Sequence, residues 1–211
     1  MDVADVTFLI QRVLNGCWSD DYVDLGLPSG TLWATRNIGA NSPEDYGDYF
    51  AWGETSPKNN YDWSTYEWCN GSMYSLTKYN TTTNYGIVDN KTELDLEDDA
   101  AYVNWGPSWR MPTKEQQDEL RESCTWTWTT RSGVNGCQVT GPNGNSIFLP
   151  AAGDRWDGSL DNVGSYGLFW SRTLDPGSSF YAYGLNFHLG YVYWYGDSRY
   201  YGSTVRAVRV P

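Results

Sequence analysis

Hydrophobic and polar positions alternate along the C-terminal part of the chain, and this pattern is typical of β-strands with two unlike faces. Within residues 191–195 the three tyrosines share one face of an extended strand, whereas Val192 and Trp194 share the other. The pattern predicts one apolar side that faces a core and one row of phenols. Residues 188–190 (His-Leu-Gly) are typical of a hairpin turn, and we expect residues 196–203 to form a loop.

Strand patterns recur through the main part of the chain, bounded by turn residues. Two short strands are expected around a Pro-Ser-Gly turn within residues 22–34. Residues 54–92 lack clear periodicity and are rich in Asn, Thr, Ser, Tyr and Gly, so we expect a long surface excursion and no second core. The other predicted strands cover residues 126–130, 137–140, 146–152, 167–171 and parts of 180–210.

Two helices are expected ahead of most of these strands. Acidic residues stand at the start of residues 94–103, where carboxylates favour the positive end of a helix. Thr113 and Gln116 occupy capping-box positions and predict a helix over residues 113–122. Helices followed by antiparallel strands place the chain in the α+β class.

The N-terminal segment differs from the rest. Residues 3–14 carry apolar side chains at helical spacing and predict a short amphipathic helix, so we divide the chain into residues 1–17 and a domain over residues 22–211. Residues 2–16 resemble the second half of a dockerin-type repeat. Asp5 would match the last ligand of its calcium loop, but the upstream ligands are absent, which favours a plain packing helix.

Charge and composition exclude several classes of function. The chain has 14 basic and 26 acidic residues, a net charge of −12 that repels phosphate backbones, so we expect no nucleic-acid partner. No apolar run approaches the ~20 residues of a membrane-spanning helix, and no signal peptide opens the chain. The 17 tyrosines, 12 tryptophans and 22 glycines favour short strands and long ordered loops.

Candidate chemical groups are sparse. Four cysteines without a CxxC pair and one histidine, His188, are too few for a structural zinc site, so we predict no metal and no cofactor. Cys124 and Cys137 flank a predicted strand and turn and could form a disulfide across a hairpin; two free buried thiols are the alternative.

Catalytic motifs are also missing from the sequence. It contains no nucleophile elbow, phosphate loop or zinc-protease motif, and we therefore expect no enzyme. Asp154, Asp157 and Asp161 lie near Trp156 and could suit glycoside hydrolysis, but a loop rich in Gly, Asn and Ser favours turn-forming aspartates.

Six segments together resemble the Fibrobacter-type major paralogous domain of bacterial proteins. They are residues 22–33, 49–54, 104–113, 148–153, 169–171 and 203–209. That family is similar in fold to C-type lectins and to the formylglycine-generating enzyme. The resemblance implies a C-type-lectin-like domain, with an antiparallel sheet, two helices and long ordered loops, that is secreted or displayed on a cell surface. The enzyme's cysteine motif and the calcium-binding Glu-Pro-Asn and Gln-Pro-Asp triplets of C-type lectins are absent.

The C-terminal segment is the candidate binding site. Its Tyr, Ser, Gly and Asp residues are the types that antibody loops favour, because Tyr gives rigid amphipathic contact at low entropy cost. From Tyr181 onward there is no Lys, Glu, Gln or Met, and Tyr, His, Asp, Ser, Gly, Leu and Asn can all arise by changing adenines in an AAC codon. The same fold carries retroelement-diversified variable proteins, and that resemblance implies these substitutable ligand-binding positions: Tyr181, Tyr183, His188, Leu189, Tyr191, Tyr193, Tyr195, Gly196, Asp197, Ser198, Tyr200, Tyr201 and Ser203.

The leading hypothesis is a monomeric extracellular or cell-surface module that binds a protein or cell-surface ligand through this segment. The main alternative is a calcium-independent carbohydrate-binding module, suggested by the dockerin-like helix and the aromatic residues. A third is a structural module of a larger adhesin or fimbrial assembly, in which the tyrosines pack against a neighbouring domain.

Overall fold

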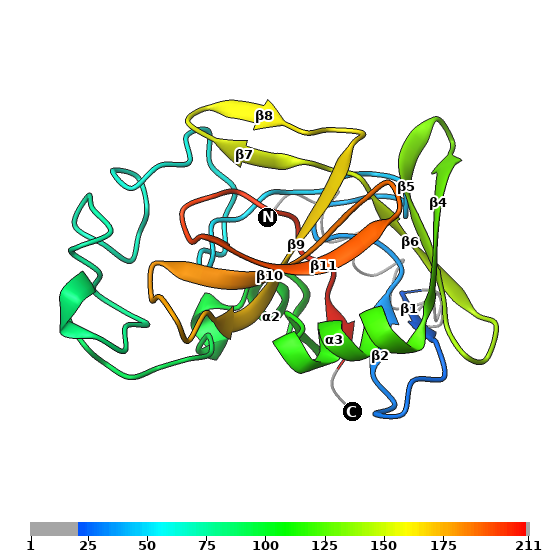
Figure 1. The fold of residues 1–211 in the computed structure, drawn as a ribbon, viewed down its shortest axis with the longest axis horizontal. Coiled ribbons are helices and arrows are strands. Elements are labelled where there is room, and N and C mark those ends of the chain that lie inside the picture. The colour runs from blue at the N-terminus through cyan, green and yellow to red at the C-terminus, as the bar shows by residue number, and fades with distance from the viewer. Residues whose placement is uncertain (1–20, 210–211) are drawn as a thin grey trace, which may run out of the picture.

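The computed structural model describes residues 21–209, and its strands form several small sheets joined by long loops (Figure 1). The predicted helix of residues 3–14, with its dockerin-like features, lies outside the described residues. All ladders between named strands are antiparallel. The part of the chain that the structure describes contains two α-helices, so the α+β class is confirmed, although several sheets replace the single sheet that we expected.

The first sheet brings the two ends of the domain together. Its order is β1 (Tyr22–Asp24), β2 (Leu32–Ala34), β12 (Val208–Arg209) and β3 (Trp109–Arg110). β1 and β2 pair around the predicted turn, where the Gly30 N–H donates to the Leu27 carbonyl at 2.9 Å. The predicted pair of short strands is therefore confirmed.

Both predicted helices form, and their first turns are capped as the sequence indicates. The 3-10 helix η2 (Leu96–Asp98) leads into α2 (Ala100–Trp105), and the Asp99 carboxylate accepts from the first backbone N–H groups of α2. α3 (Lys114–Ser123) has a complete capping box between Thr113 and Gln116.

The sheet β4–β5–β6 shows why the predicted disulfide does not form. β4 (Thr125–Arg131) and β5 (Val134–Thr140) are a hairpin in which Cys137 pairs with Trp128, while Cys124 precedes β4 at the end of α3. The cysteines are thus out of register and both thiols are free, so the structure agrees with the free-thiol alternative and not with the disulfide candidate. Burial raises the pKa of the Cys137 thiol to about 12. β6 (Ser146–Pro150) completes the sheet.

The sheet β9–β10–β11 carries the candidate segment, and Figure 1 shows it across the middle of the molecule, with α3 below it. It consists of β9 (Tyr166–Leu174), β10 (Tyr181–His188) and β11 (Tyr191–Ser198). His188 pairs with Tyr191, which confirms the hairpin turn at Leu189 and Gly190. β11 continues through Ser198, so the predicted loop begins later than residue 196.

Two regions are more ordered than the sequence indicated. Residues 154–161 form a hairpin of β7 (Asp154–Trp156) and β8 (Ser159–Asp161) in place of a loop. Residues 54–92, which include η1 (Thr83–Tyr85), supply Tyr61 and Tyr66 to a hydrophobic cluster that they share with Tyr49, Ala51 and Ala152 of the main domain. Two larger clusters fill the rest of the domain.

Among residues 21–209 no helix is long and apolar enough to cross a membrane. Within the same range, His, Cys, Asp and Glu side chains nowhere gather in a group of three that could hold a metal ion.

Candidate ligand-binding surface

The strand register divides the predicted positions between two faces of the sheet. His188, Tyr191, Tyr193, Tyr195 and Asp197 lie on one face, which we call the phenol face. The opposite face carries Tyr181, Tyr183, Gly196 and Ser198, together with Val192 and Trp194. The sequence-based prediction treated these positions as one surface, and the alternation of side chains along paired strands shows that they are two.

The phenol face is open at β11, which is the edge strand of its sheet. Tyr191 and Tyr195 are 66% and 52% exposed, and Tyr193 between them is half-buried. The imidazole of His188 lies between rings, 5.0 Å from the Tyr191 ring and 4.9 Å from that of Tyr166 on β9. The hydroxyls of Tyr191, Tyr193 and Tyr195 make no hydrogen bond to any described residue, so each can bond to water or to a ligand.

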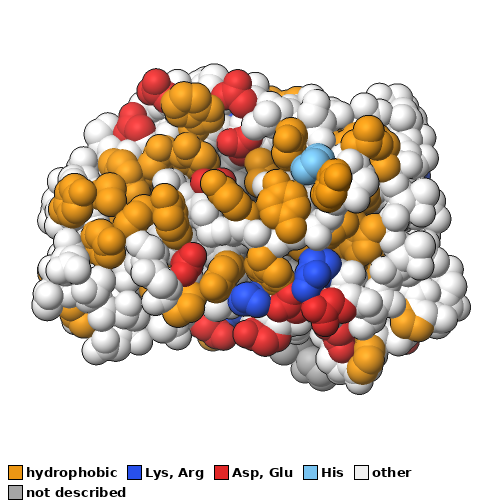
Figure 2. Space-filling view, in the orientation of Figure 1, with side chains coloured by type: hydrophobic (Ala, Val, Ile, Leu, Met, Phe, Trp, Pro, Cys, Tyr) orange, Lys and Arg blue, Asp and Glu red, His pale blue; other side chains and the backbone are white. Residues whose placement is uncertain are grey.

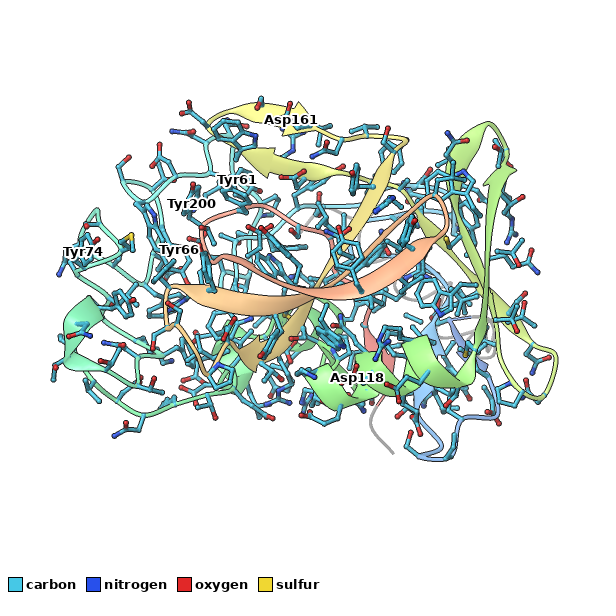
Figure 3. The ribbon with its side chains drawn as sticks, viewed as in Figure 1. Tyr61, Tyr66, Tyr74, Asp118, Asp161 and Tyr200 are labelled. Carbon is cyan, nitrogen blue, oxygen red and sulfur yellow. The ribbon has the colours of Figure 1, made fainter. Side chains whose placement is uncertain are left out.

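The opposite face packs against α3 through Trp194. The Trp194 indole N–H donates to the Asp118 carboxylate, and the Lys114 ammonium lies 4.4 Å from the Trp194 ring centroid. Lys114 also bonds to Asp118 at 2.7 Å, and Figure 3 places Asp118 on α3 beneath β11. Tyr183 packs edge-on against Trp194. This face therefore packs β11 against α3. The sequence predicted an apolar side that faces a core, and Val192 and Trp194 are half-buried there.

A buried arginine holds the start of the loop after β11. Arg199 is fully buried, and its Nε donates to the Tyr66 hydroxyl at 2.8 Å. Its other nitrogens donate to the carbonyls of Lys78, Tyr79 and Ser179 at 3.0–3.1 Å. These bonds use the guanidinium's donors, and they tie the end of β11 to the excursion and to the segment before β10.

A second buried arginine, Arg206, fixes the other end of the same segment. Its nitrogens donate to the Asn37 side chain and to the carbonyls of Ala34 and Phe148 at 2.9–3.2 Å. Between the two arginines, the backbones of Ser203 and Phe50 exchange hydrogen bonds of 3.0 and 3.1 Å. The segment beside the phenol face is thus held at both ends and in the middle by hydrogen bonds to distant parts of the chain.

The loop tyrosines continue the aromatic surface toward β7. Tyr200 packs between Trp63 and Tyr201, with ring centroids 4.9 and 4.7 Å away, and Trp156 lies 6.4 Å from Tyr201. Burial raises the pKa of both loop tyrosines. Trp156 is 43% exposed and marks the outer limit of this aromatic group.

The remaining predicted positions lie at opposite extremes of exposure. Leu189 projects from the hairpin turn and is among the most exposed apolar side chains of the described residues. Ser203 is only 2% exposed, so it cannot meet a large ligand at the surface, and its prediction as a surface contact is wrong. The nearby aspartates of the β7–β8 hairpin accept hydrogen bonds from side chains close to them in the sequence: Asp154 accepts from Asn162, and Asp161 accepts from Ser159.

Sequence reasoning missed the contributions of other segments. Tyr166 joins the phenol face from β9, and Trp63 and Trp156 flank the loop tyrosines, although none lies in the C-terminal segment. Neighbouring positions on paired strands could have identified Tyr166, since it precedes a predicted strand, but no sequence signal places Trp63. Figure 2 shows the result: hydrophobic and aromatic side chains spread across this side of the molecule, acidic groups lie above and below them, and the Lys and Arg side chains seen in this view lie below.

No protein family, curated protein or solved structure matches this chain.

Proposed function

We propose that this chain is a ligand-binding module that presents the phenol face and the adjacent loop tyrosines to a protein or cell-surface ligand. The single observation that carries the proposal is the row of Tyr191, Tyr193 and Tyr195 on an edge strand, with hydroxyls that bond to no described residue. A tyrosine on a strand needs no free hydroxyl for folding, whereas a recognition surface uses both its ring and its hydroxyl.

The rigid support of this surface favours binding over a purely structural role. Arg199 and Arg206 anchor the neighbouring loop, and Trp194 anchors β11 on α3, so the tyrosines are held in place at low entropy cost. Four or five tyrosines could supply roughly 800 Å² per partner, the usual size of a specific protein interface.

We further propose a C-type-lectin-like architecture and a bacterial origin outside the cell or on its surface, on the basis of the segments that resemble the Fibrobacter-type major paralogous domain. The proposal includes retroelement diversification of the exposed positions, and Tyr191 and Tyr195 are the first places to look for it. Ser203 is removed from the set of contact positions because it is buried. A near-copy of the gene's 3′ end beside a reverse transcriptase would support diversification.

A binding experiment with matched variants tests the proposal. The full chain is applied to an array of extracellular protein domains and to a glycan array, beside Y191A/Y193A/Y195A and the control Y74A. Tyr74 is 67% exposed, like Tyr191, but lies at the far end of the excursion (Figure 3). We expect saturable binding to protein domains that the triple variant loses and Y74A keeps. Protein binding that survives in the folded triple variant would overturn the proposal.

A second candidate is calcium-independent glycan binding, and one observation favours it. Trp156 is exposed near Tyr201, with Asp157 at the adjacent turn, and an aromatic ring beside a carboxylate can hold a sugar by stacking and hydrogen bonding. Saturable glycan binding that is lost in Trp156→Ala and kept in the triple tyrosine variant would establish this second function instead.

A further inference from the structure

A polar cleft of about 240 Å³ lies beside the β7–β8 hairpin, and none of its lining residues belongs to the phenol face. One water molecule takes about 30 Å³ in the liquid, so the cleft has room for a small organic molecule. Its lining is mostly polar and comes from residues 47–49, from residues 57–61 and from Arg155 of β7. Figure 3 shows Tyr61 below this hairpin, and the Tyr61 carbonyl accepts from the Asp157 backbone N–H at 3.0 Å.

Two buried tyrosines line the cleft and have no hydroxyl proton left for a ligand. The Tyr49 hydroxyl donates to the Ala152 carbonyl, and the Tyr61 hydroxyl donates to the Tyr49 carbonyl, each at 2.6 Å. Each phenol has a single proton to donate, and both protons are used within the fold. Recognition in this cleft therefore depends on its charged side chains.

Arg155 brings to the cleft a guanidinium that has no anionic partner among the described residues. The guanidinium lies 5.0 Å from the Tyr49 ring centroid, and its nitrogens bond to no described residue. The Arg155 backbone exchanges two hydrogen bonds of 2.8 Å with Gly202, which fixes the backbone from which the side chain extends. A guanidinium matches a carboxylate through two parallel hydrogen bonds, so Arg155 is suited to a carboxylate ligand.

Asp48 brings a carboxylate to the same cleft, and no described residue donates a hydrogen bond to it. The Asp48 backbone N–H donates to the Ile38 carbonyl at 2.8 Å. Gly39 has a φ of 79°, and a Cβ at that position would overlap the Asp48 carboxylate, so the glycine leaves the space in which the carboxylate lies. Asp48 and Arg155 form no ion pair with each other or with another described residue, and both are partly exposed.

The other cation of the cleft, Lys58, is already balanced. Its ammonium pairs with the Glu54 carboxylate at 2.8 Å and donates to the Thr65 carbonyl at 2.9 Å. The cleft therefore offers one uncompensated positive group and one uncompensated negative group. A purely anionic ligand would satisfy Arg155 alone and would be repelled by the net charge of −12, whereas a zwitterion has no net charge and satisfies both groups.

We infer that this cleft binds a small zwitterion, a free amino acid, with the ligand's carboxylate on Arg155 and its ammonium group on Asp48. Both contacts are charge-assisted hydrogen bonds, which are stronger than those between neutral groups. This site is separate from the phenol face, and the inference does not rest on the proposed function.

The test titrates the full chain with L-alanine and follows the Arg155 side-chain Nε–H signal by NMR. Two matched probes each lack one charge: propionate has no ammonium group, and ethylammonium has no carboxylate. We expect saturable binding of L-alanine and binding of either probe that is weaker by about tenfold or more, because each probe loses one charge-assisted hydrogen bond. 4-Aminobutyrate is titrated as a second amino acid whose charges are further apart, and selective binding of either zwitterion supports the inference.

Matched variants show whether the two side chains hold the ligand. Arg155→Gln and Asp48→Asn should each weaken binding of the zwitterion by about tenfold or more. Arg131→Gln and Glu97→Gln remove the same charges from exposed side chains outside the cleft, and both should leave binding unchanged.

Three results would overturn the inference. The first is the absence of saturable binding of both zwitterions to the parent protein. The second is propionate or sulfate binding as tight as that of the zwitterion, which would indicate an adventitious anion only. The third is loss of zwitterion binding in folded Y191A/Y193A/Y195A, which would place the ligand on the phenol face; we expect that variant to bind as the parent does.

Discussion

Two groups of tyrosines in this protein differ in their burial and in the hydrogen bonds of their hydroxyls. Tyr49, Tyr61, Tyr66 and Tyr79 are buried, and each hydroxyl donates to a backbone carbonyl or, for Tyr79, to the Asp98 carboxylate. The β11 tyrosines, Tyr191, Tyr193 and Tyr195, leave their hydroxyls without a partner among the described residues. The interior hydroxyls therefore serve the fold, and those on β11 are free to serve a ligand.

The comparison also shows how the fold supports its surface. Two tyrosines of the interior group contact Arg199: its Nε donates to the Tyr66 hydroxyl, and its guanidinium lies over the rings of Tyr66 and Tyr79. Arg199 stands directly after β11, so the buried tyrosines fix the end of the strand that displays the exposed ones. The contacts of Arg199 thus join the buried tyrosines to the strand that carries the exposed ones.

The largest expected effect comes from breaking the interior group at Arg199. Arg199→Met leaves three buried carbonyls and the Tyr66 hydroxyl without a donor, and we expect a loss of about 3–5 kcal/mol in the free energy of unfolding. Chemical denaturation measures it. Arg131→Met is the control, because Arg131 is exposed and pairs with Glu44 at the surface, and it should change stability by less than about 1 kcal/mol. Similar losses in both variants would contradict the assigned role of Arg199.

The next effect isolates a single interior hydroxyl. Tyr66→Phe removes a donor to the Trp52 carbonyl at 2.7 Å and the acceptor of Arg199, and we expect a loss of about 1.5–3 kcal/mol. Tyr46→Phe is matched, since Tyr46 packs against the same cluster and its hydroxyl bonds to no described residue. That variant should stay within about 0.5 kcal/mol of the parent protein. Equal stability of both variants would show that the buried hydroxyl contributes nothing.

Sequence patterns identified most elements because their signals are local. The capping box at Thr113 and the turn at Leu189 and Gly190 depend on a few adjacent residues, and both formed as predicted. The disulfide did not form because the hairpin turns at Ser132 and Gly133, which sets Cys137 against Trp128; the sequence does not state at which residues a hairpin turns.

The candidate site was predicted only in part for the same reason. The alternation of side chains correctly placed Tyr191, Tyr193 and Tyr195 on one face. Tyr181 and Tyr183 lie on the other face, because in the pairing of β10 with β11 they stand opposite Ser198 and Gly196. Arg199 and Ser203 stand in a polar stretch that resembles a surface loop, and only the tertiary packing of distant segments buries them. No periodicity within the loop could indicate that.

A pH-dependent effect distinguishes Asp197 from the tyrosines around it. An acid whose pKa is raised on folding stabilises the protein at low pH, and this contribution is lost as the pH rises from about 4 through about 7. Asp197→Asn mimics the protonated form, so we expect stability equal to the parent near pH 4 and greater by roughly 1–3 kcal/mol above pH 7. Denaturation across pH measures the difference, and parallel curves would contradict the raised pKa.

The smallest expected effect tests the central claim most directly. In Y191F/Y193F/Y195F all three rings remain and only the hydroxyls are removed, so the free energy of unfolding should stay within about 1 kcal/mol of the parent, against the larger loss from Tyr66→Phe alone. This measurement compares the two groups of tyrosines by the same chemical change. A triple variant that loses as much stability as Tyr66→Phe would show that the β11 hydroxyls belong to the fold and are not free for a ligand.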